Sequence, residues 1–146
     1  MGKREKPARG TNDGEVLSGG PERDVIRGRG GDDGIYGAGG DDRLFGGDGD
    51  DDFVAGGGDD RIDGGAGWDS AAYAASVGGY QFSFRGGALI VENLGGPVNE
   101  GTDTLRDVEE LVFRGGRVDV ALIRAMWEQG GGQPIRGSDD WVTGWG

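Results

Sequence analysis

Acidic side chains recur every nine residues through the first half of the chain. The series runs through Glu15, Asp24, Asp33, Asp42, Asp51, Asp60 and Asp69. The 146 residues include neither Cys nor His, so thiolate and imidazole metal sites and imidazole-based catalysis are excluded. Oxygen atoms remain as metal ligands, and they suit hard divalent cations. A regular series of carboxylates therefore indicates cation binding.

This series belongs to seven contiguous units of nine residues that fill residues 10–72. Position six of each unit is acidic and position eight is apolar, from Leu17 in the first unit to Ala71 in the last. Gly-rich residues at the start of a unit can turn tightly at positive φ, and the last three form a short strand. Two units that face each other across position eight make one coil of eighteen residues. Position six then forms a column on each side of the stack.

The two columns are electrostatically unfavourable by themselves. Stacked strands lie roughly 4.8 Å apart, and two carboxylates at that spacing repel by about 3–4 kcal/mol at an effective dielectric near 20. Residues 10–72 contain 16 Asp or Glu residues and only 5 Arg residues. Five divalent ions, one for each pair of same-side turns, would nearly cancel this charge. We expect the stack to close only around cations.

The repeat resembles GGxGxDxUx, where U is apolar, the nonapeptide of the repeats-in-toxin (RTX, haemolysin-type) calcium-binding proteins. The resemblance implies an all-β fold, a parallel β-roll that is a two-sheet β-helix of nonapeptide repeats. It implies calcium as the cofactor, with about three to five ions. In such rolls one turn supplies the carbonyls of positions two and four and the position-six carboxylate. The turn two units later supplies carbonyls one and three and its own carboxylate.

Carried onto this sequence, the resemblance implies three sites in regular turns. They join Arg29, Gly31 and Asp33 to Gly46, Asp48 and Asp51; Ala38, Gly40 and Asp42 to Ala55, Gly57 and Asp60; and Gly47, Gly49 and Asp51 to Gly64, Ala66 and Asp69. Two weaker sites fall on the first two units, which depart from the pattern. They would join Gly20, Glu22 and Asp24 to Gly37, Gly39 and Asp42, and Thr11, Asp13 and Glu15 to Gly28, Gly30 and Asp33. The acidic residues at position five are expected to point to solvent: Asp32, Asp41, Asp50 and Asp59.

Beyond residue 72 the nine-residue period ends, and a small β-rich segment with one short helix is expected to cap the roll. Alternation in YQFSF, the Gly86-Gly87 turn and the apolar residues 89–91 predict a hairpin. Further strands are predicted at 108–113 and 117–120, and a helix at 121–129 that docks through Leu122, Met126 and Trp127. Asp103 either completes a terminal ion site or forms an Asx turn at a strand start.

The predicted organisation is a basic leader at 1–9, the roll at 10–72, a hairpin-rich cap at 73–122, and a short helix with a Gly-rich tail at 123–146. The tail is a linker, the start of a second repeat block, or a secretion tail. We expect Trp141 and Trp145 to be exposed. A later segment or a partner is expected to cover the outward Tyr36/Val54 column.

Composition and charge limit the classes of function that the protein can have. A net charge of −12 argues against nucleic acid, and no apolar run is long enough for a membrane span. Residues 1–10 lack the apolar stretch of a signal peptide. The resemblance implies a secreted, extracellular protein that uses type I secretion machinery, with covalently linked domains in a longer parent protein, and folds when it meets calcium.

The alternative is a calcium-stabilised adhesion or carbohydrate-binding module that uses the Tyr36/Val54 face or the tail tryptophans. We expect no enzymatic activity, because the paired carboxylates Glu109 and Glu110 are adjacent on a predicted strand and so point to opposite faces.

Overall fold

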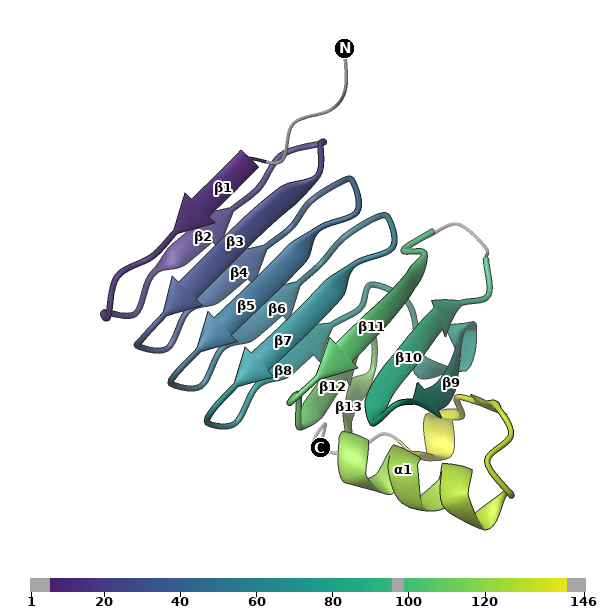
Figure 1. Cartoon of the computed structure of the whole chain (residues 1–146). Helices are drawn as coiled ribbons and strands as arrows, with labels where there is room; N and C mark the ends of the chain where they lie inside the picture. The colour runs from purple at the N-terminus through teal and green to yellow at the C-terminus, as the bar shows by residue number, and fades with distance from the viewer. Residues whose placement is uncertain (1–5, 96–98, 142–146) are drawn as a thin grey trace.

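The computed structural model describes residues 6–95 and 99–141, and the first half of the chain forms a β-solenoid of about four turns (Figure 1). Successive strands alternate between two parallel sheets. One sheet contains β1 (Lys6–Arg9), β3 (Asp24–Arg29), β5 (Arg43–Gly47) and β7 (Arg61–Gly65). The other contains β2 (Val16–Ser18), β4 (Gly34–Tyr36), β6 (Asp52–Val54) and β8 (Ser70–Ala72). The predicted parallel β-roll is confirmed.

The strand register aligns position eight along the axis of the solenoid. Leu44 of β5 pairs with Ile62 of β7, and Ile35 of β4 pairs with Phe53 of β6. These four side chains are at most 2 % exposed and form the core between the two sheets. Because a single turn buries one such residue, the solenoid gains its apolar burial only by stacking.

Tight turns at one end of each strand depend on positive φ at positions two and four. Glycine occupies both positions in the fifth unit, where Gly47 has φ 90° and Gly49 has φ 104°. The third and fourth units place Arg29 (φ 82°) and Ala38 (φ 70°) at position two, so these turns form despite the steric cost of a Cβ atom there. The first two units show no positive φ at either position, in agreement with their departure from the repeat.

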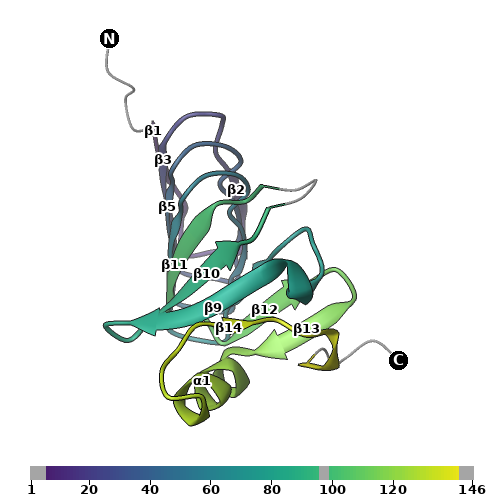
Figure 2. The ribbon, with the colours of Figure 1, turned by 90° about the vertical axis from the view of Figure 1, so that its right-hand side faces the viewer.

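Cap strands continue both sheets of the roll. β11 (Thr102–Arg106) pairs parallel with β7 and antiparallel with β10 (Ala88–Asn93), which forms the predicted hairpin with β9 (Tyr80–Arg85). In the other sheet β12 (Glu110–Phe113) pairs parallel with β8 and antiparallel with β13 (Gly116–Asp119). Seen from the cap side, these strands and α1 (Val120–Gln129) lie across the end of the coils (Figure 2). β11 was not predicted, and the strand predicted from 108 begins at Glu110.

Aromatic packing holds the cap together. Phe113 stacks on Tyr73 with ring centroids 5.6 Å apart and meets Phe82 edge-on at 6.0 Å. The predicted helix forms as α1, but Ile123 is its buried residue and Leu122 is 42 % exposed. The predicted docking through Leu122 is therefore wrong, because the helix turns this side chain away from the sheet.

The segment after α1 returns to the cap. β14 (Ile135–Arg136) pairs antiparallel with β9. The short 3-10 helix η2 (Asp139–Trp141) follows, and a second one, η1 (Val77–Gly79), precedes β9. Trp141 is partly buried, with its ring 5.9 Å from that of Phe82, so the expectation that it is exposed is wrong. Trp145 lies outside the described residues. Within the described part of the chain, no helix has the length and apolar character needed to cross a membrane.

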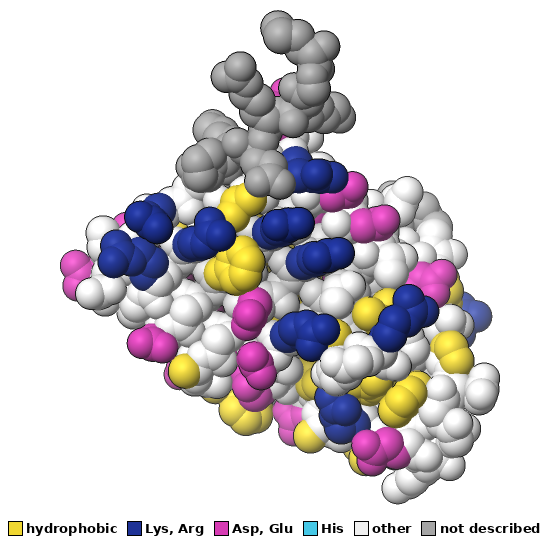
Figure 3. Space-filling view, in the orientation of Figure 1, with side chains coloured by type: hydrophobic (Ala, Val, Ile, Leu, Met, Phe, Trp, Pro, Cys, Tyr) yellow, Lys and Arg dark blue, Asp and Glu magenta, His cyan; other side chains and the backbone are white. Residues whose placement is uncertain are grey.

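The outer faces of the two sheets differ in charge. Arginine side chains gather over the sheet that contains β3, β5 and β7 (Figure 3), where Arg27, Arg43 and Arg61 are exposed. On the opposite sheet Tyr36 is 44 % exposed. A later segment of the described chain does not cover this residue, so that part of the expectation is wrong.

Candidate metal centre

Position-six carboxylates form two buried columns at the edges of the roll. The first column contains Glu15, Asp33, Asp51 and Asp69, and the second contains Asp24, Asp42 and Asp60. In Asp33 and the later position-six aspartates, Oδ1 accepts a hydrogen bond from the position-six N–H two units earlier; Asp33 N donates to Asp51 and Asp42 N donates to Asp60, both at 2.8 Å. The six aspartates are at most 2 % exposed. One oxygen of each carboxylate from the third unit onward therefore links two coils.

The second oxygen has no protein partner in five of these residues. The Oδ2 atoms concerned are buried and without a hydrogen bond in Asp33, Asp42, Asp51, Asp60 and Asp69. An unpaired buried acceptor costs about 1–3 kcal/mol, and more when it is charged. Because native proteins rarely leave such groups unpaired, these oxygens indicate a ligand that the protein chain itself does not provide.

Glycine stands at position one beside four of the five unpaired oxygens, and Ala55 takes this place in the unit of Asp60. A Cβ atom on Gly46 would clash with Asp51 Oδ2 and with the carbonyl oxygen of Gly64, which is position one of the unit two places later. Gly28 and Gly37 show the same arrangement in their own turns. Carboxylate and carbonyl oxygens thus converge at these turns, as a hard cation requires.

Burial makes an isolated negative charge unfavourable in these columns. It raises the pKa of Asp42 and of Asp51 to about 6, although a backbone N–H bond to each carboxylate opposes the shift. Burial likewise raises the pKa of Asp69 to about 7 and that of Asp33 above its ordinary value. A cation beside these groups would favour their ionised form.

The predicted carbonyl ligands at positions two and four have different surroundings. The carbonyl oxygens of position two already accept a backbone hydrogen bond, as in Asp48 N to Arg29 O (2.7 Å), Gly57 N to Ala38 O (3.0 Å) and Ala66 N to Gly47 O (3.1 Å). A carbonyl oxygen has a second lone pair, so this bond leaves one acceptor site. At position four, the Gly31 carbonyl approaches Gly49 so closely that a Cβ atom there would clash. The structure brings carboxylates and position-one carbonyls together, and the complete ligand set stays a prediction.

The first two units use their acidic groups differently. Glu15 accepts hydrogen bonds from the backbone N–H and the hydroxyl of Thr11, and Asp24 Oδ2 accepts one from Gly20 N at 2.7 Å. These bonds lie within a single turn. Protein donors therefore already bind one carboxylate oxygen of Glu15 and one of Asp24 in the two weaker predicted sites, which stay predictions.

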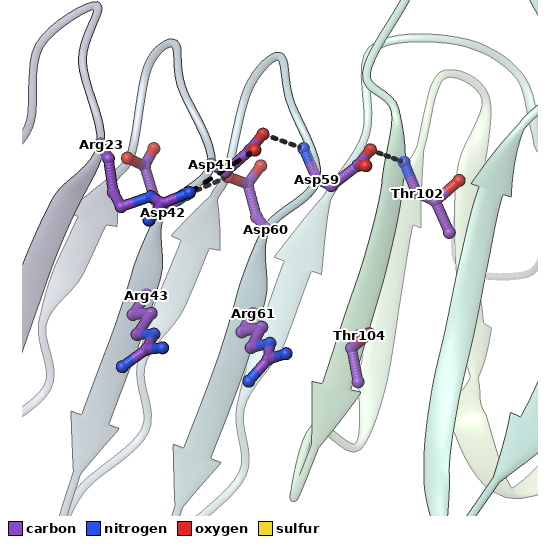
Figure 4. Close-up of a pocket in the computed structure, with 9 residues that line it drawn as sticks. All are labelled: Arg23, Asp41, Asp42, Arg43, Asp59, Asp60, Arg61, Thr102 and Thr104. Carbon is purple, nitrogen blue, oxygen red and sulfur yellow. Dashed lines mark hydrogen bonds and ion pairs between the residues drawn. The ribbon is translucent and has the colours of Figure 1, made fainter. Parts of the chain in front are cut away.

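Position-five aspartates form a second, exposed ladder. Asp41 Oδ1 accepts from Asp59 N at 2.9 Å, and Asp59 Oδ1 accepts from Thr102 N at 2.9 Å (Figure 4). Asp32 and Asp50 form the equivalent ladder in the other column of turns, which ends at Trp68 N. The four side chains are exposed, as predicted. The sequence did not reveal that each Oδ1 also accepts a backbone N–H of the following turn on the same side.

Asp103 extends the second column into the cap. Its Oδ1 accepts from Asp60 N at 2.9 Å, and its Oδ2 accepts from the Tyr73 hydroxyl at 3.0 Å. Burial raises the pKa of both carboxyl groups, and mutual repulsion adds to the effect on Asp60. The sequence contained a signal for this, since residues 98–106 read VNEGTDTLR, with Gly, Asp and Leu at positions four, six and eight of a nonapeptide. The intervening hairpin interrupts the period and hides that unit.

Side chains alone do not form a complete metal cage. Among the residues that the structure describes, no group of three or more acidic side chains is arranged to hold a metal ion. Two carboxylates per site must therefore be supplemented by backbone carbonyls, as in the ligand pattern that the repeat predicts.

Comparison with known families agrees with this geometry. A family model of four copies of the RTX calcium-binding nonapeptide repeat matches residues 9–44 and 45–71. Among curated proteins, no sequence matches the chain. The matched span contains the two carboxylate columns and their unpaired oxygens. Residues 9–71 of this chain therefore contain RTX calcium-binding nonapeptide repeats.

Proposed function

We propose that the chain is a calcium-dependent folding module of a secreted bacterial protein, and that its roll closes cooperatively as about three to five ions bind between the turns. The observation that supports this is the set of five buried Oδ2 atoms without a protein partner. Interior aspartates such as Asp51 belong to the site before and the site after their own turn. Binding at one site therefore orders a carboxylate of the next.

In this proposal the calcium affinity of the sites determines whether the chain folds inside or outside the cell. Extracellular calcium modules typically bind in the range of about 10⁻⁴–10⁻³ M. An ion that binds only the folded chain stabilises it by mass action, so a chain in calcium-poor cytosol stays unfolded. RTX repeats are typical of secreted bacterial proteins, and an unfolded chain suits export through type I secretion machinery. In this proposal the module serves covalently linked domains of a longer parent protein.

A calcium titration followed by far-UV circular dichroism tests the proposal. Chelator-treated protein is expected to gain β-structure along a sigmoidal curve in calcium but not in magnesium, which requires near-ideal octahedral geometry. Asp51→Asn is expected to move the calcium midpoint upward. Asp48→Asn is the matched control, because Asp48 is exposed and its predicted role uses only the carbonyl. A chain with the same β-spectrum in chelator and in calcium would contradict the proposal.

Exposed aromatic groups favour adhesion or carbohydrate binding as a second candidate function. Tyr36 is 44 % exposed and Trp68 is 53 % exposed. They line two neighbouring hollows that share Asp32, Asp50 and Asp52. Polysaccharide pull-down with the calcium-loaded chain tests this function, with Tyr36→Ala and Trp68→Ala expected to lose binding. Sedimentation with and without calcium separates carbohydrate binding from self-association.

A further inference from the structure

Glu109 of the cap extends the first carboxylate column. It lies beyond Asp69, at the place where another turn of the roll would put its position-six aspartate. Its Oε2 accepts a hydrogen bond from Asp69 N at 2.8 Å, as Asp69 Oδ1 accepts one from Asp51 N at 2.8 Å. The sheet register agrees, because the following residue, Glu110, pairs with Ser70 in the parallel β12–β8 pair. Glu109 therefore occupies a position-six place, although it lies outside the repeats.

The Asp107 carbonyl occupies the corresponding position-one place. A Cβ atom on Gly64 would clash with Asp69 Oδ2 and with the Asp107 carbonyl oxygen, as one on Gly46 would with Asp51 Oδ2 and the Gly64 carbonyl. Asp69 is 0 % exposed and its Oδ2 has no hydrogen-bond partner. The junction of roll and cap thus repeats the arrangement found between regular turns.

The junction differs from a regular turn in length. A single residue, Val108, separates Asp107 from Glu109, whereas four residues separate position one from position six in a regular unit. The longer Glu side chain compensates for this short turn, since it still reaches the Asp69 N–H. The seventh unit retains its full turn, with positive φ at Gly65 (85°) and Gly67 (105°).

We propose that a further calcium ion binds at this junction, between Asp69 Oδ2, the Asp107 carbonyl and the Glu109 carboxylate. The site rests on the proposed calcium-dependent function, but it lies partly outside residues 9–71 matched by the repeat family. Calcium accepts six to eight oxygen ligands, water included. Gly67 and Asp107 are exposed, so water has access to complete the shell. An ion here ties the cap to the last coil and makes cap docking depend on calcium.

Equilibrium dialysis of the full chain over a range of free calcium tests the site, with Glu109→Gln as the variant and Glu110→Gln as the matched control. Gln keeps an oxygen that can accept from Asp69 N–H, so the fold is retained while one ligand charge is lost. Glu110 instead pairs with Arg117, at 3.1 Å. One ion equivalent of Glu109→Gln is expected to move to calcium concentrations at least about tenfold higher, because ligand charge sets calcium affinity. Glu110→Gln is expected to follow the wild-type isotherm.

The outcomes separate the junction site from the proposed function. A wild-type chain that binds no calcium overturns both. A wild-type chain that binds calcium and folds, with a Glu109→Gln isotherm that overlays it, overturns only the junction site. If Glu109→Gln does not reach the wild-type dichroism spectrum in saturating calcium, the variant is misfolded and its isotherm does not test the site. A crystal structure of the wild-type chain grown in calcium then provides the test. An anomalous peak beside Asp69 Oδ2 and the Asp107 carbonyl supports the site, and its absence overturns it.

Discussion

Asp103 accepts a hydrogen bond from Asp60 N at 2.9 Å, although 43 residues separate the two. Within the roll the same bond joins residues 18 apart, as between Asp42 and Asp60. The register around it is also the same, because Leu105 pairs with Ile62 as Ile62 pairs with Leu44. The cap therefore continues the coil as well as covering its end.

Asp103→Ala is expected to lower the free energy of unfolding in saturating calcium by about 2–4 kcal/mol, because Asp60 N–H and the Tyr73 hydroxyl each lose a buried acceptor. Urea denaturation measures the loss. Asp119→Ala is the control, since Asp119 is exposed and makes no side-chain cap bond to α1; a change within about 0.5 kcal/mol is expected there. Equal losses in the two variants would contradict a specific role for Asp103.

Acidification is expected to increase the β-structure of the calcium-free chain. Burial raises the pKa of Asp42 and Asp51 from 3.8 to about 6 and that of Asp69 to about 7. Between these values the folded chain holds protons that the unfolded chain releases, so the free energy of unfolding falls as pH rises. This contribution is fully present below about pH 4 and lost by about pH 7.

Circular dichroism in metal-free buffer, recorded from about pH 4 to about pH 7, checks this dependence. This range spans the pKa values of the unfolded and the folded chain. The calcium midpoint is expected to rise as pH falls, because protons compete for the same carboxylates. A calcium-free chain that steadily loses β-structure on acidification through this range would contradict the burial of the columns.

Gly46→Ala is expected to block the site between the fifth and seventh units. Its Cβ atom would clash with Asp51 Oδ2 and the Gly64 carbonyl, whereas a Cβ atom on Gly20 meets no atom within 4 Å. We expect the calcium midpoint of Gly46→Ala to rise about tenfold or more, which corresponds to about 1.4 kcal/mol of binding free energy. Gly20→Ala is expected to follow the wild type in the same titration. If Gly46→Ala binds calcium as tightly as Gly20→Ala, the open space is not an ion site.

Exchanges of Ala and Gly at position two are expected to have opposite effects. Ala38 (φ 70°) and Gly56 (φ 83°) hold this position two units apart. Ala38→Gly removes about 1–2 kcal/mol of backbone strain, but the greater entropy of the unfolded chain costs about 0.5–1 kcal/mol, so the free energy of unfolding rises by up to about 1.5 kcal/mol. Gly56→Ala adds the strain and a clash with the Ala38 carbonyl, so it should lose more than about 2 kcal/mol.

Thermal unfolding in saturating calcium compares these two variants. A rise in Tm for Ala38→Gly and a fall for Gly56→Ala are expected. Changes of the same sign would show that left-handed backbone at position two is not the source of the difference.

The nine-residue period of the sequence was sufficient to predict the roll. Seven units in unbroken register place Ile26, Leu44 and Ile62 in one row and their aspartates in a column, because each coil contacts only the next coil along the chain. The hairpin and the helix were likewise predictable, since alternation in YQFSF and helix formers ending at Gly130 act over short distances.

Non-local contacts decided the rest. The pairing of Asp103 with Asp60 and of Glu109 with Asp69 requires that strands on the far side of the hairpin return to β7 and β8. The partial burial of Trp141 depends on its packing against Phe82, and the ladder of Asp41 and Asp59 on turns brought together by stacking. The sequence by itself thus determined the repeat, its carboxylates and their affinity for a hard cation. Only tertiary packing decided how the columns end, because the hairpin breaks the nine-residue period that makes them visible.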